Sequence, residues 1–291
     1  MKLLLIGSNG QLGQDCRHIL SPRHTICGLD VPDIDITSEQ QLTELFFREK
    51  PDGVINCAAY TAVDQGENDQ KQCLAVNACG PELLARLCDR YTCRLIHIST
   101  DYVYDGKKPV PQSYNEDDIT EPVSMYGKSK LLGDQAVINN TNNYLILRTA
   151  WLYGMGGGNF LKTMLRLALT DPERTIRVVN DQYGSLTWSW RLARQIDAVL
   201  EQDITGICHA SAENYSTWYE GARFFLDCMD VPYSLEPCTT DEYPTPAARP
   251  ANSILANNRL KEAGLNVMVD WQEDIRAFVR ANREALLAEA L

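Results

Sequence analysis

Short apolar runs alternate with longer amphipathic stretches over the first half of the chain. The apolar runs are rich in leucine and β-branched residues and are only a few residues long. Strands that are buried on both faces of a parallel sheet have this character. We therefore predict strands at 3–6, 25–29, 53–56, 94–98 and 144–147.

The stretches between these runs carry apolar residues at helical spacing, three and four positions apart. They predict helices at 11–20, 39–49, 70–90 and 124–138. Strand and helix therefore alternate, and right-handed crossovers bring successive strands into one parallel sheet. The fold class expected is α/β, a doubly wound parallel sheet of Rossmann type.

The second half of the chain is less regular. Residues 154–158 are rich in glycine and residues 243–252 in proline, and helices are expected at 161–169, 190–200, 217–229 and 270–287. We predict a first domain at 1–150 and a smaller substrate-binding domain at 151–291. The second is expected to be discontinuous, with part of 160–210 returning to the first.

Composition excludes several classes of protein. The net charge of −12 argues against nucleic acid as a partner, because phosphate backbones bind Lys and Arg. The ten cysteines form no CxxC pair and the four histidines no HExxH motif, so no metal site is expected and the cysteines are interpreted as reduced core thiols. The N-terminal apolar run is too short for a signal peptide, and no segment is expected to cross a membrane. These features favour the cytoplasm.

A glycine turn follows the first predicted strand and opens the first helix. Gly7, Gly10 and Gly13 have the spacing GxxGxxG, and a pyrophosphate can bind free N–H groups at such a helix start. A tight turn with no ligand is the alternative. Asp30, at the end of the second strand, stands where a carboxylate meets an adenosine ribose, which favours NAD over NADP without excluding either. Asp35 and Ile36 are candidates to flank the adenine.

Tyr126 and Lys130 lie four residues apart on a predicted helix and therefore share one face. A phenol is a poor acid at neutral pH, but an adjacent cation lowers its pKa. The pair is a candidate acid and its tuning cation, although a surface Tyr and Lys at chance spacing would look the same.

The fourth predicted strand breaks into hydroxyl and acid residues at its carboxyl end, where ligands of open α/β sheets bind. The Thr100 hydroxyl can donate to a substrate carbonyl beside Tyr126 and stabilise the oxygen that gains charge. Helix capping by Ser99 or Thr100 is the alternative.

Together these motifs resemble the extended short-chain dehydrogenases, and more narrowly the dTDP-4-dehydrorhamnose reductase family. The resemblance covers nearly the whole chain. The segments that carry it are 7–13, 56–64, 99–104, 126–130, 148–153, 159–160, 179–184 and 243–250.

The resemblance implies a role for each matching residue. Thr100, Tyr126 and Lys130 would form a catalytic triad, with Tyr126 and Lys130 also contacting NADPH or NADH. The other residues implied to bind the cofactor are Gly7, Gly10, Gln11 and Leu12 at the pyrophosphate, Asp30, Asp35 and Ile36 at the adenosine, and Ala58, Ala59, Tyr60 and Thr61 in between. The residues implied to meet the sugar are Thr100, Asp101 and Trp151.

The implied reaction is reduction of the 4-keto group of dTDP-4-dehydro-L-rhamnose to dTDP-L-rhamnose. We add the hypothesis that Arg249 binds the substrate diphosphate, because a guanidinium fork suits that group; a surface arginine after a proline turn is the alternative. Another nucleotide-sugar reductase or epimerase has the same scaffold. A regulatory subunit of methionine adenosyltransferase type resembles the family without catalysis.

One region departs from some relatives, which dimerise around magnesium through glutamates. Asp15 and the run Trp188, Ser189 and Trp190 stand at those places, so bridging by magnesium is not expected. The aromatic residues belong either to another contact or to the core. The chain is expected to be a monomer or a homodimer.

Overall fold

The computed structural model describes residues 1–290, and its first lobe is built on a six-stranded sheet in the order β10-β5-β4-β3-β1-β2. Every pair of neighbouring strands in it is parallel. The strands are β1 (Lys2–Ile6), β2 (Thr25–Leu29), β3 (Gly53–Asn56), β4 (Arg94–Thr100), β5 (Tyr144–Thr149) and β10 (Gly206–His209). The predicted doubly wound parallel sheet is confirmed.

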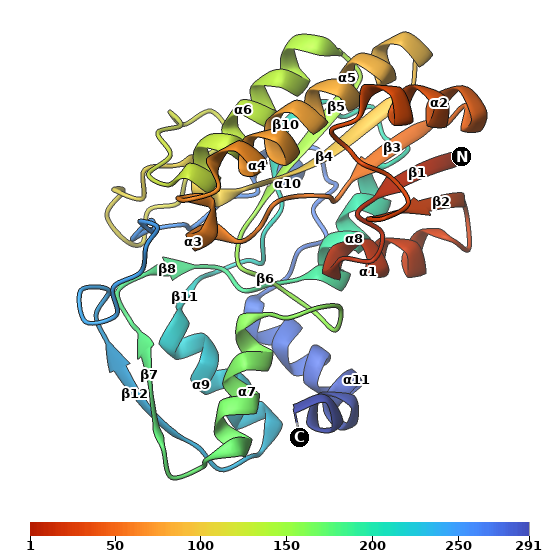
Figure 1. Ribbon diagram of the computed structural model, residues 1–291. Coiled ribbons are helices and arrows are strands. Elements are labelled where there is room, and N and C mark those ends of the chain that lie inside the picture. The colour runs from red at the N-terminus through yellow and green to blue at the C-terminus, as the bar shows by residue number, and fades with distance from the viewer. Residues whose placement is uncertain (291) are drawn as a thin grey trace.

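Helices cover both faces of this sheet (Figure 1). α1 (Gln11–Leu20) and α8 (Ser189–Val199) pack on one face, and α2 (Glu39–Glu49), α5 (Gly80–Tyr91) and α6 (Met125–Asn140) pack on the other. In β1, Leu3 and Leu5 face α1 whereas Leu4 and Ile6 face α2. This is why the strand sequence is apolar throughout.

The strand order reverses between β1 and β3. The chain runs outward from β1 to β2, then returns to β3 and continues in the other direction. The loops after β1 and β3 therefore diverge at the carboxyl ends of the strands, which is the usual ligand site of such sheets.

The helix predicted at 70–90 is interrupted. It consists of α4 (Gln70–Leu74), a π-helical turn η1 (Ala75–Cys79) and α5, after the short helix α3 (Val63–Gly66). A π turn keeps the chain helical but has i→i+5 hydrogen bonds in place of i→i+4 bonds. The periodicity therefore predicted one continuous helix, which is wrong at this point.

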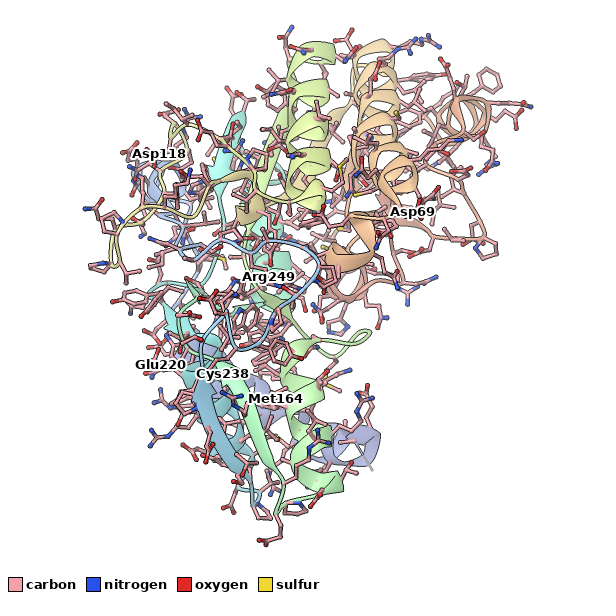
Figure 2. All side chains as sticks on the ribbon, turned by 60° about the vertical axis from the view of Figure 1, so that its left-hand side comes forward. Asp69, Asp118, Met164, Glu220, Cys238 and Arg249 are labelled. Carbon is pink, nitrogen blue, oxygen red and sulfur yellow. The ribbon has the colours of Figure 1, made fainter. Side chains whose placement is uncertain are left out.

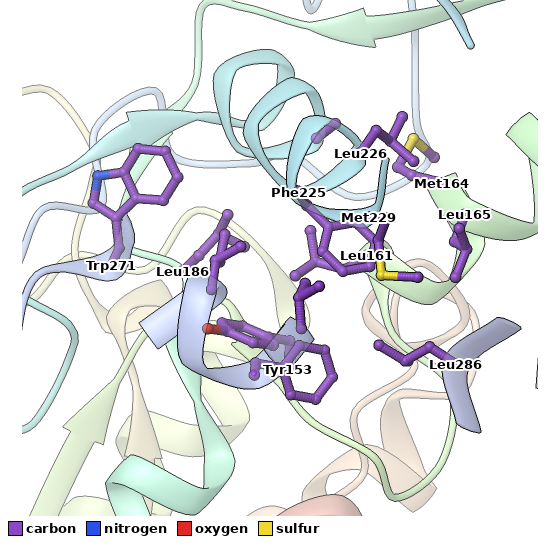
Figure 3. Packing of buried hydrophobic residues seen from close by; sticks show 14 of the residues in the cluster. Tyr153, Leu161, Met164, Leu165, Leu186, Phe225, Leu226, Met229, Trp271 and Leu286 are labelled. Atoms are coloured by element: carbon purple, nitrogen blue, oxygen red, sulfur yellow. The ribbon is translucent and has the colours of Figure 1, made fainter. Parts of the chain in front are cut away.

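The second lobe has its own core, formed by α7 (Phe160–Thr170), α9 (Trp218–Met229) and α11 (Trp271–Ala290) (Figure 3). β7 (Thr175–Val179) pairs in parallel with β12 (Ser234–Cys238) beside these helices. Two smaller pairs complete the lobe: β6 (Leu152–Tyr153) with β9 (Thr187–Trp188), and β8 (Tyr183–Gly184) with β11 (Ser216–Thr217).

The chain passes between the lobes more than once. After α7 and β7 it adds α8 and β10 to the first lobe, and then α9 and β12 to the second. α10 (Asn258–Glu262) lies beside β10 (Figure 1). The sequence did not predict β10 or the short strands, and the division at residue 150 stays a prediction.

One expectation about the cysteines needs correction. Cys79 is exposed, so it is not a core thiol, whereas Cys16, Cys73 and Cys88 are buried and all ten cysteines are free.

Within residues 1–290 there is no helix of the length and apolar character required to cross a bilayer.

Candidate functional site

The glycine turn after β1 brings three backbone segments into close contact. Gly7 has a φ of +81°, and a Cβ there would lie 2.6 Å from the backbone nitrogen of Ala58. A Cβ on Gly13 would collide with the carbonyl oxygen of Gly7. Any side chain at either position would separate α1 from the loops after β1 and β3.

The start of α1 is open to an anion. Its N-cap, Gly10, has no side chain to accept from the first helical N–H groups, and the first turn contains no acidic residue. Gln11 and Leu12 supply the next N–H groups. Uncapped N–H groups and the helix dipole both favour a phosphate here, so the cradle fits a dinucleotide pyrophosphate.

Asp30 directly follows β2 and is bound to this turn. Its carboxylate accepts from the backbone N–H of Asn9 and of Val31, each at 2.8 Å. Asp35 is exposed and accepts from the hydroxyl and N–H of Thr37, which lower the pKa of its carboxyl. Ile36 is buried, with its side chain against Gly80.

The segment 58–61 after β3 is held by a residue that the sequence did not single out. The side chain of Asn77, in η1, accepts from the N–H of Tyr60 at 2.8 Å and donates to its carbonyl at 3.0 Å. It also donates to the hydroxyl of Ser129 on α6. Asn77 thereby connects Ala58, Ala59, Tyr60 and Thr61 to the helix that carries Tyr126 and Lys130.

Thr100 and Asp101 stand at the carboxyl end of β4 and are both buried. The Thr100 hydroxyl donates to Asp101 Oδ1 at 3.0 Å and accepts from the N–H of Tyr102 at 3.2 Å. Burial raises the pKa of Asp101 to about 6, against the lowering effect of the Ser253 and Thr100 hydroxyls. The other carboxylate oxygen, Oδ2, is buried with no hydrogen-bond partner among the described residues.

Helix α6 sets Tyr126 and Lys130 against the end of β4. Its N-cap Ser124 accepts from the N–H of Gly127, and a Cβ on Gly127 would collide with the carbonyl of Tyr102. This close approach brings the Tyr126 ring edge-on to Tyr102, with centroids 5.5 Å apart. Lys130 Nζ is buried and donates to the Ile98 carbonyl at 2.6 Å.

The pKa values differ from the expectation for this pair. Burial raises the pKa of the Tyr126 phenol above its ordinary value, and interaction with the Thr100 hydroxyl is the effect that lowers it. Burial lowers the pKa of Lys130 to about 8. The expected acidification of Tyr126 by Lys130 is wrong for this arrangement, because the ammonium is directed at a strand carbonyl.

A buried ion pair lies behind Lys130. Asp134, one turn further along α6, accepts from Arg148 Nε and Nη2 of β5, each at 3.1 Å. Arg148 also donates to the Tyr104 hydroxyl. The negative charge of Asp134 favours the charged form of Lys130 and partly offsets the cost of burial.

Trp151 lies where β5 leaves the sheet and enters the second lobe. Its backbone is left-handed, with a φ of +46°, and its side chain is half-buried. The indole stacks on Trp218 of α9, with ring centroids 3.7 Å apart and planes 12° apart. Trp151 thus stands at the junction of the two lobes.

Arg249 lies on a loop between the lobes (Figure 2). Its guanidinium makes a two-pronged ion pair with Asp64 of α3, at 3.0 and 2.8 Å, and donates to the Ala247 carbonyl. The pKa of Asp64 is lowered by this arginine. The charge of Arg249 also lowers the pKa of the Tyr102 phenol, against the larger effect of burial, which raises it.

The residues predicted from sequence therefore gather at one edge of the sheet, apart from the Ile36 side chain and the exposed Asp35. Asp15, where the sequence predicted no bridging magnesium, accepts from the Ser189 hydroxyl at 2.5 Å. Trp188 is buried in the second-lobe core and Trp190 is half-buried. No group of three or more His, Cys, Asp or Glu side chains in residues 1–290 could hold a metal ion.

Known proteins are similar to this chain in sequence over nearly its whole length. The family described as RmlD substrate binding domain matches residues 1–284. The chain is 36% identical to a dTDP-4-dehydrorhamnose reductase of Sinorhizobium fredii, over 97% of both chains. It is 35% identical to the spore coat polysaccharide biosynthesis protein SpsK of Bacillus subtilis, over 98% of this chain and 99% of the relative.

A solved structure is similar in fold as well. The dTDP-4-dehydrorhamnose reductase of Bacillus anthracis, in complex with NADP, superposes with a TM-score of 0.93. It is 34% identical, and the match covers 96% of this chain and 99% of that chain.

Proposed function

Because this chain belongs to the dTDP-4-dehydrorhamnose reductase family, we propose that it reduces the 4-keto group of dTDP-4-dehydro-L-rhamnose to dTDP-L-rhamnose. It is an NAD(P)-dependent oxidoreductase. The observation that carries the proposal is the cluster of Thr100, Tyr126 and Lys130 beside the glycine cradle. Shared fold alone would leave the reaction open.

The glycine turn and the loop after β3 would hold the cofactor. Gly7, Gly10, Gln11 and Leu12 offer backbone N–H groups to a pyrophosphate, and Asp30 offers a carboxylate to a ribose hydroxyl. Asp35, Ile36 and the segment 58–61 would line its adenosine and central parts. NADPH or NADH, when bound, supplies the hydride that reduces the keto carbon.

Tyr126 acts as the proton donor. Its raised pKa keeps the phenol protonated at neutral pH, which is the state needed to protonate the oxygen that becomes an alkoxide. The O–H bond of Tyr126 breaks and the proton ends on the sugar oxygen. Lys130, on α6, donates to the Ile98 carbonyl of β4 and would contact the nicotinamide ribose.

The sugar is bound between the lobes. Asp101 has a buried carboxylate oxygen free to accept from a sugar hydroxyl, Trp151 contacts the ring, and Arg249 lies where a diphosphate would enter. The acidic chain as a whole is compatible with this substrate, because a single local guanidinium can bind the diphosphate.

The free thiols favour a reducing compartment, so we place the protein in the cytoplasm. The nucleotide sugar is its partner, with no nucleic acid or membrane involved, and it acts as a monomer or homodimer without magnesium.

The deciding experiment supplies dTDP-4-dehydro-L-rhamnose, made enzymatically, and follows oxidation of NADPH and of NADH. One molecule of NADPH or NADH is expected to be oxidised per molecule of keto-sugar reduced. UDP- and GDP-linked keto-sugars are expected to give no turnover. Tyr126→Phe should lower kcat by about 10²- to 10⁴-fold while leaving cofactor affinity unchanged.

Three results would contradict the proposal. Turnover without added reductant indicates an epimerase, and faster turnover of another keto-sugar indicates a different reductase. Cofactor binding with no turnover of any nucleotide sugar indicates a regulatory subunit of methionine adenosyltransferase type.

A further inference from the structure

Trp218 covers one face of the Trp151 indole. The two indoles are nearly parallel and in direct contact, with centroids 3.7 Å apart. Trp218 is the first residue of α9, in the second lobe, whereas Trp151 follows directly on the first-lobe sheet. The stack is therefore a contact between lobes at the edge of the proposed sugar site.

Trp151 could not hold its position through its own backbone. A φ of +46° is unfavourable for a residue with a Cβ and persists only where the surroundings enforce it. The indole edge is enclosed by Gly184, where a Cβ would lie 2.5 Å from the ring, and one ring face is enclosed by Trp218. These contacts decide which part of Trp151 stays exposed.

Trp218 is itself fixed from two sides. Its Nε1 donates to Gln182 Oε1 at 3.1 Å, and the same amide donates through Nε2 to the Thr240 hydroxyl. Gln182 is buried, so it cannot exchange this bond freely for water. The ring of Phe160 packs edge-on against Trp218 at 4.7 Å. The orientation of Trp218 is thus set by the second lobe before any ligand arrives.

We propose that Trp218 is a positioning residue for the sugar: it holds the Trp151 indole in one plane and so fixes how the 4-keto-hexose ring is oriented toward Tyr126. This inference rests on the proposed function and extends it, because it assigns the orientation of the sugar to a residue of the second lobe. Nucleotide binding, which uses other groups, should not depend on Trp218.

Binding measurements with two ligands test this assignment. We expect Trp218→Leu to weaken binding of dTDP-L-rhamnose by about five- to tenfold, since one aromatic stack is worth about that much. Binding of dTDP alone, which lacks the sugar, should change by less than about twofold. Steady-state kinetics should show the same rise in KM for the keto-sugar and a smaller change in kcat. Trp218→Phe should recover most of the loss.

A spectroscopic readout reports the stack itself. Stacked indoles give an exciton couplet in circular dichroism, and we expect Trp218→Leu and Trp151→Leu to remove the same couplet. Trp190→Leu is the matched control, because Trp190 stacks on Trp188 and on neither of these two indoles. Trp190→Leu should remove a different circular dichroism signal and leave the binding of dTDP-L-rhamnose unchanged.

The outcomes separate this inference from the proposed function. If Trp151→Leu weakens sugar binding and Trp218→Leu does not, the positioning role is refuted while the reductase assignment stands. An equal loss of affinity for dTDP and for the sugar nucleotide in Trp218→Phe, which keeps an aromatic ring, also refutes it. If the wild-type protein binds neither ligand, the proposed function itself has failed.

Discussion

At the scale of single residues, the Thr100 hydroxyl has one proton and two possible acceptors for it: the Asp101 carboxylate and the substrate carbonyl. In the structure this proton points to Asp101 Oδ1, and one lone pair accepts from the Tyr102 N–H. While Asp101 is ionised, its carboxylate holds the Thr100 proton, and Thr100 cannot donate to a carbonyl at the same time. Tyr126 is then the donor to the substrate oxygen, and the role of Thr100 as a second donor stays a prediction.

Asp101→Asn tests how much the buried Asp101 carboxyl lowers the free energy of unfolding. The folded-state pKa, about 6, is above the ordinary aspartate value, so the folded chain binds this proton more tightly than the unfolded chain does. The contribution of Asp101 to stability is therefore lost as pH rises from about 4 through 6. At pH 7 the variant should be more stable by about 1–3 kcal/mol, measured by urea unfolding.

The gain should shrink toward zero as the pH is lowered to about 3 and below, because Asp101 is then mostly neutral in both states. kcat/KM should fall by about tenfold or more, since a charged acceptor for the sugar is removed. Asp117→Asn is the control, because Asp117 is exposed and should change stability by less than about 0.5 kcal/mol. A destabilised Asp101→Asn at pH 7 would show that burial does not strain this group.

At the scale of elements, the π turn η1 decides where Asn77 points. The Asn77 amide binds the Tyr60 backbone and Ser129 together. The Asn77 carbonyl also packs so closely on α6 that Gly133 could carry no side chain. One turn therefore joins the cofactor loop to the catalytic helix, as π turns at functional sites often do.

Asn77→Ala should separate these two elements. The N–H and carbonyl of Tyr60 would each lose a buried partner, so the free energy of unfolding should fall by about 2–4 kcal/mol. The KM for the cofactor should rise more than the KM for the sugar nucleotide, because the segment 58–61 belongs to the cofactor side. Asn68→Ala, at an exposed position, should change neither quantity. Equal rises in both KM values would argue for a general loss of structure instead.

At the scale of the whole molecule, the chain passes between the two lobes more than once, and the loop that carries Arg249 also lies between them. Arg249, on that loop, pairs with Asp64 of the first lobe, and the pair is only partly buried. Two roles are therefore open to Arg249: connecting the loop to the first lobe, or binding the substrate diphosphate. The structure contains the first contact, and the second stays a prediction.

A pair of variants distinguishes these roles. Arg249→Ala removes both contacts, and it should raise the KM for the nucleotide sugar by about tenfold or more if the guanidinium binds the diphosphate. Asp64→Asn removes the partner but leaves the guanidinium, and it should raise KM by less than about threefold. Equal effects in both variants would show that Arg249 only connects the loop.

The sequence by itself determined the parts whose cause is local. Apolar runs and helical spacing located the first five sheet strands and the helices that cover them, because alternation and helical period depend on near neighbours. The GxxGxxG turn and the Tyr126 and Lys130 pair were found for the same reason, since their geometry is fixed within one turn of chain. The family inferred from these motifs is confirmed.

The tertiary structure alone decided the rest. β10 and the strands of the second lobe are short, and what makes them strands is a partner that lies far along the chain. The Asn77 contacts depend on a π turn that periodicity does not resolve. The raised pKa of Tyr126 and the stacking of Trp218 on Trp151 arise from burial between segments distant in sequence, and local pattern contains no information on such contacts.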